Sequence, residues 1–204
     1  MELFYSPLAC SLASRIALYE AGAQPTFTAV DLEAKRTRTG EDYLAINPMG
    51  QVPAIRTDSG ETLTENPVVL QYVADRHPDA HLAPTDPVGR ARLQQWLSFV
   101  GTELHKLVFS PLLDPAAPED AKRYARAKAG PRFAVLDRHL AGRDYLLDRF
   151  SVADAYLAAI LNWASFVKID FDEWPALKAY RDRLMARPAV AKALAEEYEQ
   201  YKAA

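Results

Sequence analysis

The feature that most constrains the fold of this chain is that its strand-like segments all precede residue 78. Short apolar, aromatic and β-branched runs at residues 3–5, 26–30, 53–56 and 61–64, the last two joined as a hairpin, alternate with stretches of helical spacing. A crossover between the first two strands would be right-handed. The alternation therefore predicts a small mixed sheet with helices on both of its faces.

Beyond residue 78 the pattern changes. The segment 78–87 contains three prolines and no usable period, and the residues after it show only helical spacing. We therefore expect an α/β domain at residues 1–78, a linker at 79–87 and an all-helical domain at 88–204. Within the helical part, the helix expected over residues 118–139 should break or bend near Pro131.

The composition is that of a folded globular protein, with 50% hydrophobic and 25% charged residues. A net charge of -3 gives no reason to expect a nucleic-acid partner. The single cysteine excludes an internal disulfide framework and fits a reducing compartment. Neither a signal peptide nor an apolar run of membrane-spanning length is apparent, so we expect a cytoplasmic protein with no membrane partner.

That cysteine, Cys10, follows a short strand and a proline-containing turn and comes at the start of a helical pattern. The pattern runs from residue 11 to 21 and stops at Gly22. The N–H groups and dipole of a helix N-terminus favour a thiolate, and Arg15 would add to that field. We therefore interpret Cys10 as reactive, with a pKa below the usual value of about 8.5. The alternative is a small buried apolar residue, which is common for cysteine.

A second helix start lies at residues 65–67, where Asn66 suits the N-cap and Pro67 the first helical position. A helix N-terminus binds anions, and the carboxylate of Glu65 beside it would bind an amine. Together with Cys10 at the other helix start, this arrangement suits a ligand that has a thiol in its middle and carboxylates and an amine at its ends.

In the helical half, polar residues recur at spacings of three and four along one expected helix: Gln95, Ser98, Thr102 and His105. This stripe would face a cleft or a partner, which favours a functional His105 over the alternative of a packing residue. Residues 151–154 read as a capping box, so Asp154 is interpreted as structural. The four histidines and one cysteine show no metal-ligand spacing, and we expect no metal.

Five motifs follow one another along nearly the whole chain: Tyr5-Ser6-Pro7 with Ala9-Cys10-Ser11-Leu12, Asn47-Pro48-Met49-Gly50-Gln51-Val52-Pro53, Leu63-Thr64-Glu65, Glu103-Leu104-His105-Lys106 and Ser151-Val152-Ala153-Asp154-Ala155-Tyr156. In this order they resemble the cytosolic glutathione transferases, and the cysteine and the Glu-Leu-His-Lys run resemble the bacterial beta class. The resemblance implies a thioredoxin-like N-terminal domain and an all-α helical-bundle C-terminal domain that carries the acceptor-substrate site. The sequence departs from the family at Asn66, where Ser or Gly is usual, and at residues 13–15, where the beta class has Pro and His.

The resemblance also implies a site for reduced glutathione, which would be a co-substrate. Val52, followed by a cis Pro53, would pair through its backbone with the cysteinyl part of the tripeptide. Glu65 and the N–H of Asn66 would bind the γ-glutamyl end, and Lys35 would bind the glycine carboxylate.

The same resemblance implies the catalytic residues. Cys10 would lie beside the glutathione sulfur, Ser11 would support that sulfur, and His105 would approach it from the second domain. A site completed by a neighbouring subunit would include three further residues, which makes a homodimer the expected assembly: Ser98, Glu103 and Lys106.

We therefore expect a glutathione transferase that conjugates reduced glutathione to small hydrophobic electrophiles, with thiol–disulfide exchange through Cys10 as a second chemistry. Two alternatives remain at this point. One is a glutathione-dependent isomerase of the zeta type, although its Ser-Ser-Cys run differs from the Leu8-Ala9-Cys10 found here. The other is a non-catalytic protein that binds glutathione.

Overall fold

The computed structural model of the chain describes residues 1–203. These residues form two compact units. The first unit joins residues 1–83 to the segment that begins at Pro188, and the second covers Pro84–Arg187. No helix within the described residues combines the length and apolarity needed to cross a membrane.

The first unit is built on a five-stranded sheet with the order β3-β2-β1-β4-β5. The central strand β1 pairs parallel with β2 and antiparallel with β4, so the predicted mixed sheet is confirmed. The strands are β1 Glu2–Tyr5, β2 Thr26–Asp31, β3 Arg36–Thr37, β4 Ala54–Arg56 and β5 Thr62–Thr64.

The short strand β3 was not predicted. Its two residues pair antiparallel with Val30 and Asp31 at the end of β2. Two residues are too few to show the alternation by which a strand is recognised in a sequence.

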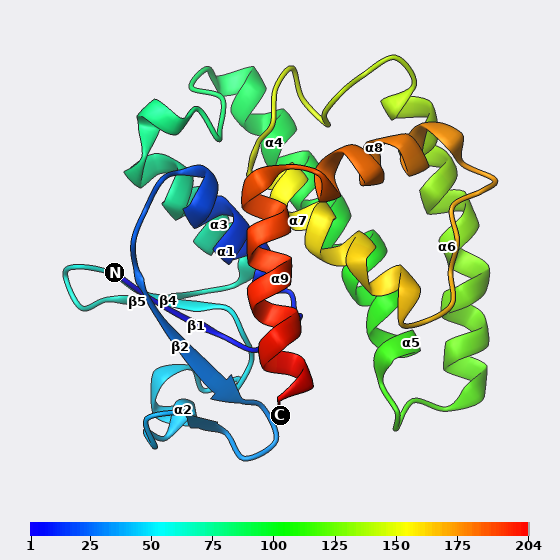
Figure 1. Ribbon diagram of the computed structural model, residues 1–204. Coiled ribbons are helices and arrows are strands. Elements are labelled where there is room, and N and C mark those ends of the chain that lie inside the picture. Colours follow the sequence, from blue (N-terminus) through cyan, green and yellow to red (C-terminus); the bar gives the residue numbers. More distant parts are fainter. Residues whose placement is uncertain (204) are drawn as a thin grey trace. The chain divides into compact units, whose positions relative to one another are not determined.

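Helices cover both faces of this sheet, with α1 and α3 on one face and α2 on the other (Figure 1). On the side of α2, Phe4, Val30, Tyr43, Val52 and Ala54 form one buried cluster. The helices of the first unit are α1 Leu12–Glu20, α2 Tyr43–Ile46, α3 Asn66–Arg76, the 3-10 turn η1 Pro78–Ala80, and α9 Pro188–Lys202.

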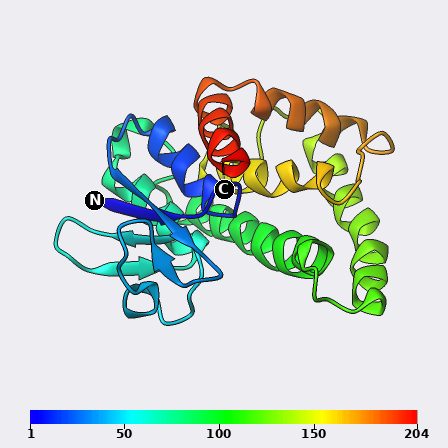
Figure 2. The same cartoon turned by 60° about the horizontal axis from the view of Figure 1, so that its bottom comes forward.

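The second unit, as expected, shows only helices and loops. Its first three elements form one continuous rod (Figure 2), whose middle section η2 is a π-helix with i→i+5 hydrogen bonds. The elements are α4 Pro87–Phe99, η2 Val100–Phe109, α5 Ser110–Leu113, α6 Glu119–Leu140, α7 Val152–Asn162, the 3-10 turn η3 Trp163–Ser165, and α8 Pro175–Met185.

Of the break or bend expected near Pro131, the break is absent, because helix α6 continues through this residue. Two residues beyond the proline, the ring of Phe133 lies 5.2 Å from that of Phe171 and 5.1 Å from that of Trp174. Tertiary contacts of this kind offset the hydrogen bond that a proline removes from a helix.

Helix α7 is buried along its whole length, and its N-terminus carries the predicted capping box. The fully buried carboxylate of Asp154 accepts hydrogen bonds from the N–H and hydroxyl of Ser151, from the N–H of Leu146 and from the hydroxyl of Tyr180. Burial raises the pKa of Asp154, while these donors oppose the shift. The structural role expected for this residue agrees with its contacts.

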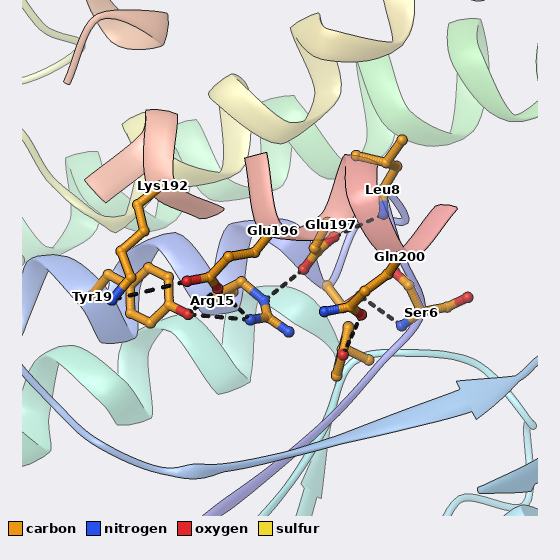
Figure 3. A network of polar contacts seen from close by, with 10 residues as sticks. Ser6, Leu8, Arg15, Tyr19, Lys192, Glu196, Glu197 and Gln200 are labelled. Carbon is orange, nitrogen blue, oxygen red and sulfur yellow. Dashed lines mark hydrogen bonds and ion pairs between the residues drawn. The ribbon is translucent and has the colours of Figure 1, made fainter. Parts of the chain in front are cut away.

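The last helix of the chain, α9, packs against α1 within the first unit (Figure 3). Arg15 packs against the rings of Tyr5 and Phe27, with its guanidinium carbon 4.3 and 4.0 Å from their centroids. Its Nε donates to the buried carboxylate of Glu197 at 2.8 Å, and the N–H of Leu8 donates to the same carboxylate at 2.7 Å. Burial raises the pKa of Glu197 to about 7, although both donors favour the anion.

We expect Glu197→Ala to lower the free energy of unfolding by about 3 to 5 kcal/mol, because it leaves the guanidinium of Arg15 buried without its main partner. Glu196→Ala is the matched control. Glu196 lies on the same helix and also accepts from Arg15, but its side chain is 38% exposed, so we expect a loss below about 1 kcal/mol. Urea unfolding at pH 7 measures both variants. Equal losses would contradict this account of the α1–α9 contact.

Candidate functional site

Cys10 lies in the turn between β1 and α1, two residues before the helix begins at Leu12. The expected position at a helix N-terminus is thus confirmed. Leu8, earlier in the turn, has a left-handed backbone with φ 59°. The buried hydroxyl of Ser11 does not cap the helix. It donates to the carbonyl of Ser6 and accepts from the N–H of Ser6, both at 3.2 Å.

The thiol of Cys10 donates a hydrogen bond to the carbonyl of Val52, with 3.1 Å between Sγ and oxygen. The peptide between Val52 and Pro53 is cis, as expected. Because a carbonyl oxygen accepts from a thiol and repels a thiolate, this contact favours the protonated side chain. It opposes the effect of the helix N-terminus on which the sequence-based interpretation relied.

The second expected source of positive field is also weakened. The charge of Arg15 is paired with Glu197 and Glu196, and its guanidinium packs against two aromatic rings. The prediction that Arg15 would add to the field at Cys10 therefore loses its main support. Within the first unit, Arg15 joins α1 to α9.

The side chain of Asn66 connects the start of α3 to the turn before α1, a contact that the sequence did not indicate. Helix α3 begins at Asn66, and Glu65 is its N-cap residue, so the expected capping role of Asn66 is wrong by one position. Its side-chain amide donates to the carbonyl of Cys10 at 2.8 Å, while its oxygen accepts from Ser14 at 3.1 Å. Glu65 is exposed and has a left-handed backbone with φ 68°.

Lys35 also has a left-handed backbone, with φ 55°, and its ammonium donates to the carbonyl of Gly50 at 3.0 Å. It therefore lies against the loop that leads to Val52. Two of the expected motifs meet at Cys10 in the first unit. The carbonyl of Val52 accepts from the Cys10 thiol, and the side-chain amide of Asn66, at the start of α3, donates to the Cys10 carbonyl.

The remaining expected residues lie on the α4–η2 rod of the second unit. Ser98 and Lys106 are exposed there. Glu103 accepts from both Nε and Nη2 of Arg132 on α6, at 3.0 and 2.7 Å. The sequence did not indicate this ion pair within the unit, and the role of Glu103 in a site shared between subunits stays a prediction.

His105 is buried, whereas the other three members of the expected polar stripe are exposed. Its Nδ1 lies 2.8 Å from the hydroxyl of Tyr156, and its ring meets that of Trp163 edge-on. The stripe was projected with the spacing of an α-helix, but His105 belongs to the π-helix, where successive residues turn through a different angle. Burial, together with the charge of Lys106, lowers the pKa of His105 to about 4.

Two contacts that prediction missed lie in the loop before Val52. The hydroxyl of Tyr43 and the side-chain amide of Asn47 both donate to the carbonyl of Gln51. Asn47 belongs to the motif at residues 47–53 that the sequence analysis describes, whereas no sequence pattern indicates a role for Tyr43. Within residues 1–203, no group of three or more His, Cys, Asp or Glu side chains is placed to hold a metal ion.

The lowered pKa of His105 predicts a pH dependence of stability. The unfolded chain takes up a proton at His105 near pH 6.5 and the folded protein only near pH 4, so stability is lost as pH falls between these values. We expect the loss between pH 7 and 4.5 to be smaller in His105→Gln by roughly 2 to 3 kcal/mol. Urea unfolding of both proteins at the two pH values measures this difference. An identical loss in the two proteins would mean that His105 is protonated in the folded state.

Comparison with known proteins places this geometry in a family. The family model of the glutathione S-transferase N-terminal domain matches residues 9–76, and that of the glutathione S-transferase C-terminal domain matches residues 100–188. Glutathione S-transferase GstA of Escherichia coli O157:H7 is 42% identical over 199 residues, which cover 97% of this chain and 98% of that protein.

Solved structures agree with this assignment. A sphingomonad glutathione S-transferase complexed with glutathione is 50% identical, with a TM-score of 0.92, and the match covers 97% of this chain and 99% of that one. The bacterial beta class glutathione S-transferase of Sphingomonas chungbukensis is 47% identical, with a TM-score of 0.92 and coverage of 97% and 98%. The chain therefore belongs to the glutathione S-transferase family and, within it, resembles the bacterial beta class along nearly its whole length.

Proposed function

We propose that this transferase conjugates reduced glutathione to small hydrophobic electrophiles and that Cys10 adds a thiol–disulfide exchange. The observation that carries the proposal is the convergence, within one unit, of the Cys10 thiol, the Val52 carbonyl and the start of α3. These three features match the thiol, the peptide groups and the γ-glutamyl carboxylate of glutathione.

In the proposed complex, the backbone of Val52 pairs with the cysteinyl residue of the tripeptide as a further strand would. The γ-glutamyl carboxylate binds at the N-terminus of α3, beside Asn66, and the amine binds the exposed carboxylate of Glu65. Lys35 binds the glycine carboxylate. The sphingomonad relative complexed with glutathione supports this reading at 50% identity.

Two reactions are proposed at the sulfur atoms. In conjugation, the glutathione thiol loses its proton, the resulting thiolate attacks the carbon of the electrophile, and a thioether forms. In exchange, the Cys10 thiolate attacks the glutathionyl sulfur of a mixed disulfide, and the acceptor thiolate leaves. A second glutathione then attacks the Cys10–glutathione disulfide, which releases glutathione disulfide and restores the thiol.

The roles proposed for the other residues follow from their environment. If His105 acts on the glutathione sulfur, it does so as a neutral imidazole through hydrogen bonding, because its pKa of about 4 leaves it uncharged at pH 7. Ser11 would support the turn around Cys10 through its bonds to Ser6. The single cysteine also favours a cytoplasmic, reducing location.

Cys10→Ala separates the two reactions. We expect it to abolish reduction of glutathionylated disulfides, and to change conjugation of 1-chloro-2,4-dinitrobenzene by less than about tenfold, because the attacking sulfur of conjugation belongs to glutathione. Intact mass after mild oxidation with glutathione disulfide should show one glutathionyl adduct on the wild-type protein and none on Cys10→Ala. Loss of both activities to the same extent would assign Cys10 to conjugation itself. Retention of thiol transfer would remove it from both.

We also propose a homodimer, because Ser98, Glu103 and Lys106 are expected to complete a site on a neighbouring subunit. Two-fold symmetry is the commonest solution for such an exchange of residues. Light scattering at micromolar concentration should report twice the mass of one 22.7 kDa chain. A fully active monomer would contradict this proposal.

A further inference from the structure

The loop that leads to Val52 has carbonyl groups fixed from several directions. Three successive carbonyls, at residues 50, 51 and 52, each accept a hydrogen bond from a side chain of another segment. The carbonyl of Gln51 differs from its neighbours because it accepts two. The hydroxyl of Tyr43 donates to it at 2.8 Å and the side-chain amide of Asn47 at 2.7 Å.

The two donors are themselves well held. Tyr43 is fully buried, its ring lies 5.9 Å from that of Phe4, and its N–H donates to the carbonyl of Lys35 at 2.9 Å. Asn47 is 5% exposed and uses its other polar groups on the same loop. Its side-chain oxygen accepts from the N–H of Met49, and its backbone carbonyl accepts from the N–H of Gly50.

The position of the Gln51 carbonyl determines where the next N–H points. Cis peptide bonds within residues 1–203 are confined to Val52–Pro53, so the peptide between Gln51 and Val52 is trans. In a planar trans peptide the carbonyl and the N–H point in opposite directions. Because Tyr43 and Asn47 hold the carbonyl on their side, the N–H of Val52 points away from them.

That N–H donates to no acceptor among the described residues, although Val52 is only 7% exposed. A backbone donor in so buried a residue normally has a partner. We propose that Tyr43 and Asn47 are positioning residues for glutathione, which orient the Gln51–Val52 peptide and thereby direct the Val52 N–H at the cysteinyl carbonyl of the tripeptide. This inference rests on the proposed function and adds two residues that do not themselves touch the ligand.

The test uses the full-length protein and S-methylglutathione, a thioether that binds without disulfide exchange. Tyr43→Phe removes one donor and keeps the buried ring, so we expect the dissociation constant to rise about three- to tenfold. Asn47→Asp keeps the acceptor for Met49 but turns an oxygen toward the Gln51 carbonyl, so we expect a rise of more than about tenfold at pH 7. Isothermal titration calorimetry measures both.

Tyr180→Phe is the matched control. It also removes a buried tyrosine hydroxyl that donates a hydrogen bond, but in the second unit, to Asp154. It should lower the melting temperature and leave the affinity for S-methylglutathione unchanged. In steady-state conjugation, Tyr43→Phe should raise the KM for glutathione and change kcat by less than about twofold, because an interaction shared by ground and transition states is lost.

The outcomes separate this inference from the proposed function. If Tyr43→Phe and Asn47→Asp melt at lower temperature but bind S-methylglutathione like the wild type, the two residues are only structural and the inference is wrong, while the transferase function stands. If Asn47→Asp does not fold, Tyr43→Phe alone decides. If the wild-type protein binds neither S-methylglutathione nor glutathione, the proposed function fails and this inference fails with it.

Discussion

Backbone carbonyls and N–H groups in irregular segments need partners as much as those in helices and strands, and the first unit of this transferase depends on how that need is met. The turn before α1 and the loop before β4 have few ladder hydrogen bonds, so side chains from elsewhere bond their backbone. Asn66 from α3 bonds the carbonyl of Cys10, and Glu197 from α9 bonds the N–H of Leu8. The thiol of Cys10 bonds the carbonyl of Val52. The first two contacts join the turn around Cys10 to α3 and α9, and the third joins it to the loop before β4.

In the second unit, buried ionisable side chains also depend on hydrogen-bond partners. Asp154 is fully buried and has four hydrogen-bond donors around it, from Leu146, Ser151 and Tyr180. His105 is buried with the hydroxyl of Tyr156 at its Nδ1, and burial lowers its pKa so that the ring is neutral at pH 7. The protonation state of this histidine is therefore a consequence of where the π-helix places it. A surface histidine on an α-helix would have titrated close to its ordinary value.

Signals that are local in the sequence predicted their structures well. The proline at the start of α3, the capping box of α7 and the glycine just after α1 all act within one helical turn. The mixed sheet followed from the alternation of strand and helix patterns. Errors arose where the signal was short or assumed a regular helix. The two-residue strand β3 is below the length of any period, and the stripe that ends at His105 was projected through a π-helix as if it were an α-helix.

By itself, the sequence determined the fold class, the family and the position of Cys10 before a helix, because each depends on residues that are close together or on motifs in a set order. Only the tertiary structure decided which groups face one another. The partners of Cys10 and Leu8 lie 56 and 189 positions away, and nothing local to either segment encodes the match. The same holds for the charge of Arg15. The sequence suggested that this charge would act at Cys10, but in the fold it is paired with Glu197, because a buried guanidinium needs a carboxylate within hydrogen-bond distance.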